Sequence, residues 1–268
     1  MKTICRPSKE QWFDLTRRPA IESRTLETHV RNLLDQTKSG GISIIRALSK
    51  EYDGYDPDPI MVSREEMNSA SGKLSSDLKK AIDRASKNIE RFHRNQQREL
   101  PIVYISQNIQ CWQKDVPVES VGFYIPGGTA PLFSTVLMLG IPAMIAGCEE
   151  KVICTPADSN GVVHPAVLYA ADLCGINKVF RIGGVQAIAA MAYGIGSVPQ
   201  VDKIFGPGNQ YVTMAKQLVS EDGIAIDMPA GPSEVLVMAD QSADPQFVAS
   251  DLLSQAEHGA DSQVILLC

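Results

Sequence analysis

Residues 120–154 read SVGFYIPGGTAPLFSTVLMLGIPAMIAGCEEKVIC, and this stretch decides the fold class. A run of aromatic and β-branched residues at 120–125 ends in a proline and two glycines, and a second β-branched run follows at 151–154. The apolar residues 131–146 between them have the length of a helix. A strand, a glycine-rich turn, a helix and a strand in this order predict a β-α-β unit with parallel strands.

The part of this stretch from Ser120 to Cys148 carries no charged side chain and is long enough on paper to cross a bilayer. It contains five glycines and three prolines, and a second uncharged stretch at 182–201 is interrupted in the same way. Glycine and proline at turn positions favour a buried α/β core over a membrane span. We therefore expect no membrane partner.

The same alternation continues to the end of the chain. Short β-branched runs recur at 178–182, 203–205, 234–239 and 263–267, with helical stretches near 163–173, 185–193, 209–219 and 245–258. Strands that alternate with crossover helices predict a doubly wound, mostly parallel sheet with helices on both faces.

The N-terminal part has a different pattern, because residues 1–119 carry 37 charged side chains and residues 120–268 only 19. Ser63 and Glu66 fit a helix capping box. Apolar residues then recur at spacings of three and four, which predicts one stripe on a long helix. They are Leu74, Leu78, Ile82, Ala85, Ile89 and Phe92.

Composition excludes several classes of protein. The chain has 268 residues, a formal net charge of −6 and a pI near 5.3, so no nucleic-acid partner is expected. The N-terminal residues 1–12 lack the apolar core of a signal peptide. The cysteines form no CxxC pair, which favours a reducing compartment and a cytoplasmic protein. They are Cys5, Cys111, Cys148, Cys154, Cys174 and Cys268.

Three strand-to-helix corners are rich in glycine, at 126–128, 183–184 and 206–209. Glycine lets backbone N–H groups approach a ligand, and the N-terminus of the following helix favours a diphosphate. None of the corners is a G-x-G-x-x-G motif, and glycine also serves turn geometry alone. Nucleotide binding and a purely structural role are therefore both open at this point.

Three further groups of residues could carry chemistry. Gln255 and His258 share one helix face and could bind one metal ion, although a histidine before a glycine C-cap also suits a helix end. Ser233 lies in a polar loop, but outside a G-x-S-x-G elbow, so a serine hydrolase is not expected. The cysteines at 148, 154 and 174 lie in apolar segments, where inert core thiols are the rule.

Five blocks of the sequence resemble one known family. They are GFYIPGGTAPLFSTVLMLGIPA at 122–143, FRIGGVQAIAAMAYG at 180–194, VDKIFGPGNQYVT at 201–213, IDMPAGPSEVLVMAD at 226–240 and VASDLLSQAEHGADSQVILL at 248–267. With RRPAI at 17–21 they are similar to histidinol dehydrogenase, and the resemblance covers the whole chain.

This resemblance implies an oxidoreductase that converts L-histidinol to L-histidine through the aldehyde, the last step of histidine biosynthesis. It implies two NAD per turnover, a zinc ion and a homodimer. It also implies two incomplete Rossmann-like domains, similar to those of aldehyde dehydrogenases. The expected division is 1–119 for the helical region and the start of the first domain, 120–233 for the second domain and 234–268 for the return to the first.

The resemblance also assigns site residues. Tyr124, Gln186 and Asn209 match positions that contact NAD. Gln255 and His258 match two of four zinc ligands, which favours the metal reading of that helix end. Ser233, together with these two ligands, matches the substrate-binding positions.

The family's catalytic Glu–His pair, an aspartate ligand and a histidine ligand are expected beyond residue 268. Glu257-His258 belongs to the ligand motif and is not that pair. The chain as given is therefore expected to be a truncated form without catalytic residues and without turnover. The alternative is a non-catalytic nucleotide- or metabolite-binding protein, or a fragment that pairs with a complete subunit. A thiol enzyme would lose activity when Cys154 is changed to alanine, and we expect little loss.

Overall fold

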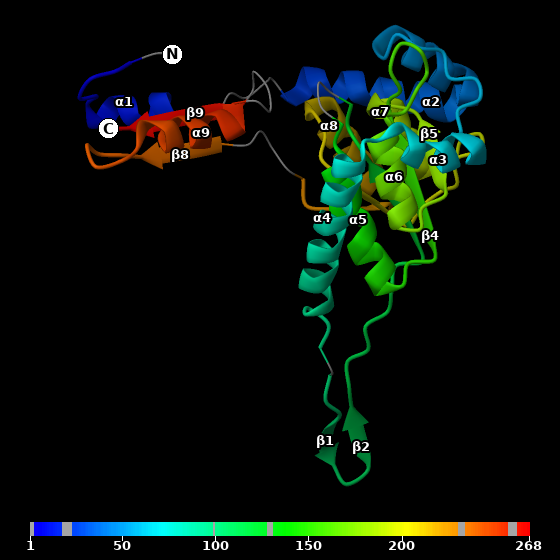
Figure 1. The fold of residues 1–268 in the computed structure, drawn as a ribbon. Helices are drawn as coiled ribbons and strands as arrows, with labels where there is room; N and C mark the ends of the chain where they lie inside the picture. Colours follow the sequence, from blue (N-terminus) through cyan, green and yellow to red (C-terminus); the bar gives the residue numbers. More distant parts are fainter. Residues whose placement is uncertain (1–2, 18–22, 99, 128–130, 230–233, 257–261) are drawn as a thin grey trace. The chain divides into compact units, whose positions relative to one another are not determined.

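The computed structural model describes residues 3–17, 23–98, 100–127, 131–229, 234–256 and 262–268 (Figure 1). By its internal contacts the chain forms two compact units. One contains residues 27–229, and the other combines residues 1–26 with 230–268. The division expected at residues 119 and 233 stays a prediction.

A parallel sheet forms the centre of the larger unit (Figure 1). In the described residues its order is β5-β4-β3-β6-β7, and every neighbouring pair is parallel. The strands are β3 (Ser120–Tyr124), β4 (Glu150–Thr155), β5 (Lys178–Arg181), β6 (Lys203–Phe205) and β7 (Ala225–Ile226). The predicted doubly wound α/β fold is confirmed, and the strand order reverses between β3 and β6.

Helices cover both faces of this sheet. The right-handed crossovers that parallel strands favour put α5 (Phe133–Ala146) and α6 (Pro165–Leu173) on one face, and α7 (Gly184–Tyr193) and α8 (Gln210–Glu221) on the other, given this strand order. α5 packs against α6, and α7 packs against α8. The apolar run that could have been mistaken for a membrane span is thus β3 and α5 of a buried core. No helix among the described residues is both long and apolar enough to cross a membrane.

The charged N-terminal part is helical, as predicted. It contains α2 (Ser23–Tyr52), α3 (Arg64–Ala70) and α4 (Ser76–Arg94), and α4 packs on α5. The capping box is present, because Ser63 accepts a hydrogen bond from the Glu66 backbone and the Glu66 carboxylate accepts one from the Ser63 backbone.

The predicted apolar stripe lies on the long helix α4 from Leu78 onward, but Leu74 precedes this helix and the Ser63 capping box starts the separate helix α3. The short 3₁₀ turn Ser71–Lys73 and an extended Leu74 separate α3 from α4. Ser75 accepts a hydrogen bond from the Leu78 backbone and so caps a new helix. Ile82 is fully buried on the predicted stripe, but Phe92 at its far end is 63% exposed.

A hairpin that the sequence pattern did not predict precedes the sheet. Its strands, β1 (Val103–Ser106) and β2 (Ile109–Cys111), pair antiparallel, and all of their residues are exposed. Without a buried face there is no strict alternation of apolar and polar residues to reveal it.

The smaller unit is built on a second β-α-β arrangement. β8 (Glu234–Met238) and β9 (Gln263–Leu267) pair parallel, as predicted, and α9 (Pro245–Ala256) packs on both. α1 (Lys9–Thr16) belongs to the same unit, where the Gln263 side chain donates a hydrogen bond of 3.3 Å to the Leu15 carbonyl.

Candidate functional site

Three glycine-rich corners lie at the carboxyl edge of the five-stranded sheet, where doubly wound sheets bind ligands. The corners after β3 and β6 adjoin each other at the reversal of strand order. Gly206 has a φ of 126°, and a Cβ on it would lie 2.1 Å from the Tyr124 carbonyl oxygen. Only glycine allows the two corners to come this close.

Tyr124 ends β3 and is buried at 5% exposure. Its hydroxyl oxygen accepts a hydrogen bond of 3.2 Å from the Gly184 backbone N–H, so it joins the corner after β3 to the corner after β5. Burial raises the pKa of the phenol to about 12, and the group is neutral at pH 7. The structure records no acceptor for the hydroxyl proton among the described residues, so that proton is available to a ligand.

Gln186 lies in the first turn of α7 and is 1% exposed. Among the described residues its amide nitrogen has no hydrogen-bond partner. A buried donor without a partner costs about 1–3 kcal/mol, so this atom marks a place where a ligand's acceptor would be favourable. The amide oxygen lies against Gly184, where a Cβ would come within 2.8 Å of it.

Asn209 caps α8. Its side-chain oxygen accepts hydrogen bonds of 3.1 Å from the backbone N–H groups of Tyr211 and Val212. The amide nitrogen is the part of this exposed side chain that is left for a ligand. The structure thus brings Tyr124, Gln186 and Asn209 to one edge of one sheet.

Asp53 is a residue of this edge that the sequence analysis missed. It follows α2, and its carboxylate accepts a hydrogen bond from the Gly183 backbone. The oxygen Oδ2 is buried and has no partner among the described residues. Burial raises the pKa of this carboxyl to about 6. Nothing in the local sequence distinguishes Asp53 from its neighbours Asp56 and Asp58, which pair with Arg46 at the surface.

A buried ion pair holds the corner after β6, and it was also missed. Lys216 on α8 is 5% exposed and forms an ion pair with Asp227. Its ammonium group donates a hydrogen bond of 2.8 Å to the Gly206 carbonyl, and the Asp227 carboxylate accepts one of 2.8 Å from the Gly206 N–H. The two side chains therefore fix the peptide groups on both sides of Gly206.

The predicted zinc and substrate residues are only partly described. Ser233 and His258 lie outside the described residues. Gln255 lies in the last turn of α9 and is half-buried, with its amide nitrogen 3.5 Å from the Ser262 hydroxyl. Within the described ranges, no group of three or more His, Cys, Asp or Glu side chains could hold a metal ion.

The internal cysteines are core residues. Cys148, Cys154 and Cys174 are buried, and burial raises the pKa of each thiol. Cys154 is fully buried in β4. A neutral thiol without solvent access is a poor nucleophile, so the expectation of inert core thiols is supported.

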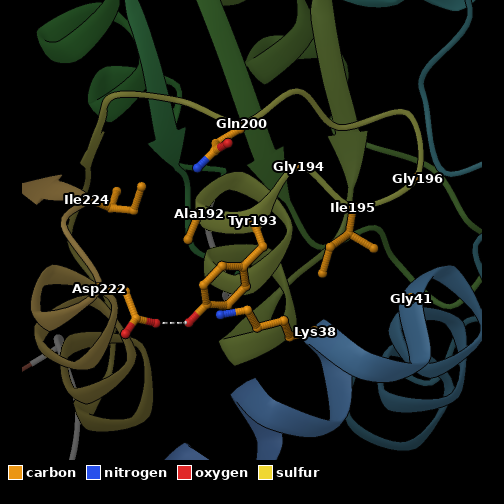
Figure 2. Close-up of a pocket in the computed structure, with 10 residues that line it drawn as sticks. All are labelled: Lys38, Gly41, Ala192, Tyr193, Gly194, Ile195, Gly196, Gln200, Asp222 and Ile224. Carbon is orange, nitrogen blue, oxygen red and sulfur yellow. Dashed lines mark hydrogen bonds between the residues drawn. The ribbon is translucent and has the colours of Figure 1, made fainter.

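A cavity of about 550 Å³ lies at the opposite ends of α7 and α8 (Figure 2). Three of its polar side chains contact one another. The Lys38 ammonium lies 4.4 Å from the centre of the Tyr193 ring, and the Tyr193 hydroxyl donates a hydrogen bond of 2.7 Å to Asp222. None of the predicted site residues that the structure describes lines this cavity.

Comparison with known proteins gives a consistent result. The family model for histidinol dehydrogenase matches residues 16–268. Histidinol dehydrogenase of Bacteroides thetaiotaomicron is 56% identical over 267 residues, which are 100% of this chain and 62% of that protein. The Escherichia coli protein of the same name is 54% identical over 261 residues, 96% of this chain and 59% of that protein.

The fold agrees with a solved structure. The crystal structure of histidinol dehydrogenase from Elizabethkingia anophelis superimposes with a TM-score of 0.89 at 49% identity, covering 97% of this chain and 60% of that one. This chain thus spans about 60% of the length of the relatives that it matches. On sequence and fold together, the chain belongs to the histidinol dehydrogenase family.

Proposed function

We propose that this chain forms the NAD-binding part of an enzyme that oxidises L-histidinol to L-histidine, the last step of histidine biosynthesis. The observation that carries the NAD assignment is the edge of the sheet between β3 and β6. There the strand order reverses. Among the described residues, neither the hydroxyl proton of Tyr124 nor the buried amide nitrogen of Gln186 has an acceptor.

The chain's own groups suggest how a dinucleotide would be held. The Tyr124 hydroxyl and the Gln186 amide would each donate a hydrogen bond to an oxygen of the cofactor, and the Asn209 amide nitrogen would donate a third. Each of these groups is neutral, so it orients the cofactor without adding a charge to the site.

The diphosphate would lie at the N-terminus of α5. Side chains already occupy the other two helix N-termini, because Asp53 and Tyr124 bind the first N–H groups of the α7 corner and Asn209 binds those of α8. At α5 the N-cap residue Leu132 makes no side-chain hydrogen bond to the helix. Free N–H groups at a helix N-terminus suit a phosphate.

Gln255 and His258 would hold the zinc ion, and Ser233 would contact the substrate beside it. Of these, the described residue Gln255 offers an amide oxygen at a helix end, which is a weak zinc ligand, so the imidazole of His258 would contribute most of the affinity. Zinc, when bound, supplies a positive centre that orients the nitrogen atoms of the substrate. We further propose that the family protein acts in the cytoplasm as a homodimer.

We assign NAD binding and not turnover to residues 1–268, because we place the family's catalytic Glu–His pair outside them. A non-catalytic nucleotide-binding protein would make the same NAD contacts. The two hypotheses are distinguished by assaying a protein extended by the family's remaining residues, with zinc, histidinol and NAD. The enzyme hypothesis predicts that it reduces NAD, and the binding-protein hypothesis predicts that it does not.

The test of the NAD assignment is calorimetric titration of residues 1–268 with NAD. We expect saturable binding, weakened about tenfold or more by Gln186→Ala or by Tyr124→Phe. Gln200→Ala is the matched control, because Gln200 lines the cavity at the other ends of the helices, and it should leave the affinity within about twofold. A wild-type chain without saturable NAD binding, or a Gln200 variant as weak as the Gln186 variant, would contradict the proposal.

A further inference from the structure

Asp53 occupies a place that stability alone does not explain. Its oxygen Oδ2 is buried without a partner among the described residues, which costs free energy in the folded protein. It also directly follows α2, and the C-terminus of a helix is the unfavourable end for a carboxylate. A group held at such a cost is a candidate for ligand binding.

The surroundings of Asp53 place it at the carboxyl end of β4. A Cβ on Gly183 would lie 2.9 Å from Asp53 Oδ1 and also 2.9 Å from Cβ of Pro156, the residue that follows β4. In dinucleotide-binding α/β folds, an acidic residue beyond the first glycine-rich turn binds the adenosine ribose. In this chain the position after β4 is a proline, whose side chain cannot hydrogen-bond, and Asp53 brings a carboxylate there from α2.

The second unpartnered atom near this corner is the amide nitrogen of Gln186. Asp53 Oδ2 is an acceptor beside Gly183, and the Gln186 amide nitrogen is a donor of the residue beside Gly184. Both lack partners among the described residues, so they match a ligand group that donates one hydrogen bond and accepts another. A hydroxyl group does this, whereas a phosphate accepts and, beside a carboxylate, is repelled.

The nearest basic side chain on β5 does not offset that repulsion. Arg181 already forms an ion pair with Glu66 and donates hydrogen bonds to the carbonyls of Gly161, Pro59 and Met61. Sites that accept a 2′-phosphate place an arginine next to it. The guanidinium of Arg181 is therefore not available to bind a 2′-phosphate.

We propose that Asp53 binds the 2′-hydroxyl of the adenosine ribose and thereby excludes dinucleotides that carry a 2′-phosphate. This inference rests on the proposed NAD site and names the residue that sets its cofactor specificity. Gln186 completes the arrangement by donating to the same hydroxyl group.

The experiment measures dissociation constants of residues 1–268 for NAD and NADP by calorimetric titration. We expect the wild-type chain to bind NAD at least about tenfold more tightly than NADP. Asp53→Asn keeps the size of the side chain and an oxygen that accepts from Gly183, so only the charge is lost. It should weaken NAD binding about tenfold and bring the NAD-to-NADP ratio close to one.

Asp58→Asn is the matched control, since it removes the same charge from an exposed side chain of the same loop. It should leave both dissociation constants within about twofold. If Asp53→Asn leaves the NAD-to-NADP ratio unchanged while wild-type NAD binding is intact, the inference fails and the proposed NAD site stands. If the wild-type chain binds neither dinucleotide, the proposed NAD site fails and the inference with it.

A ligand series on the wild-type chain keeps the inference testable even if the variant does not fold. ADP and 2′-deoxyadenosine diphosphate differ by one ribose hydroxyl. We expect ADP to bind about tenfold more tightly, and equal affinities for the two would overturn the assignment.

Discussion

Arg181 and Glu66 form an ion pair in which the guanidinium is 5% exposed, and it joins the end of β5 to the first turn of α3. Three further hydrogen bonds, of 2.8–3.2 Å, run from the same guanidinium to the carbonyls of Gly161, Pro59 and Met61. One side chain thus fixes the loop after α2, the loop after β4 and the start of α3. The loop after α2 is the one that carries Asp53.

Replacing this guanidinium by an apolar side chain should destabilise the protein strongly. Arg181→Met leaves three backbone carbonyls and a carboxylate without their donor, and we expect a loss of about 3–5 kcal/mol in the free energy of unfolding. Arg46→Met is the control, because Arg46 pairs with Asp56 and Asp58 at the surface and should cost less than about 1 kcal/mol. Urea denaturation followed by circular dichroism measures both. Equal losses of unfolding free energy for the two variants would show that the Arg181 contacts do not stabilise these loops.

Gly206→Ala should disrupt the corner between β6 and α8. The added Cβ would lie 2.1 Å from the Tyr124 carbonyl oxygen at a φ of 126°, while Lys216 and Asp227 hold the backbone in place. We expect a loss of about 3 kcal/mol in stability and a matching loss of NAD affinity. Gly72→Ala has open space around its Cβ and should be neutral or slightly stabilising. A Gly206 variant with wild-type melting temperature would contradict the close approach of the two corners.

The carboxyl of Asp53 should make stability depend on pH in an unusual direction. Burial raises its pKa from 3.8 to about 6, so the folded state binds its proton more tightly than the unfolded state does. Its contribution to stability is therefore present below about pH 4 and is lost as the pH rises through 6.

Asp53→Asn removes this dependence. At pH 7.5 the variant should be more stable than the wild type by on the order of 1 kcal/mol, less than the full pKa shift would give because solvent reaches part of the side chain. The difference should shrink towards pH 4.5. Denaturation curves of both proteins at several pH values measure it, and a variant that is less stable at pH 7.5 would assign Asp53 a structural role instead.

The six thiols should divide into two classes. Cys5, Cys111 and Cys268 are exposed, whereas Cys148, Cys154 and Cys174 are buried in the larger unit. In the native protein we expect three thiols to react with an aromatic disulfide reagent within minutes and three only on unfolding. Titration in the absence and presence of guanidinium gives the two counts. Rapid reaction of a fourth thiol in the native protein would contradict this prediction, because it would show that the reagent reaches a buried cysteine.

The local pattern of the sequence determined the sheet and its corners. Alternating β-branched runs, apolar helices and glycine turns are short-range signals, so the strands from residue 120 onward and their parallel direction were predictable, except for the two-residue strand β7. The corners that carry Tyr124, Gln186 and Asn209 were predictable for the same reason. The break before α4 was missed because an apolar stripe continues across Leu74, while a single capping serine starts the new helix.

The tertiary structure alone decided which charged residues lie at the candidate site. Asp53 meets Gly183 across a long separation in sequence, and in the printed sequence it looks like any aspartate of a polar loop. Lys216 and Asp227 surround Gly206 only because α8 returns beside β6 and β7. Periodicity reports which face of an element is buried, but burial and pairing of a charge depend on what the fold brings next to it. The sequence by itself therefore determined the edge of the sheet at which we propose that a ligand binds, and the folded chain decided which carboxylate lies at that edge.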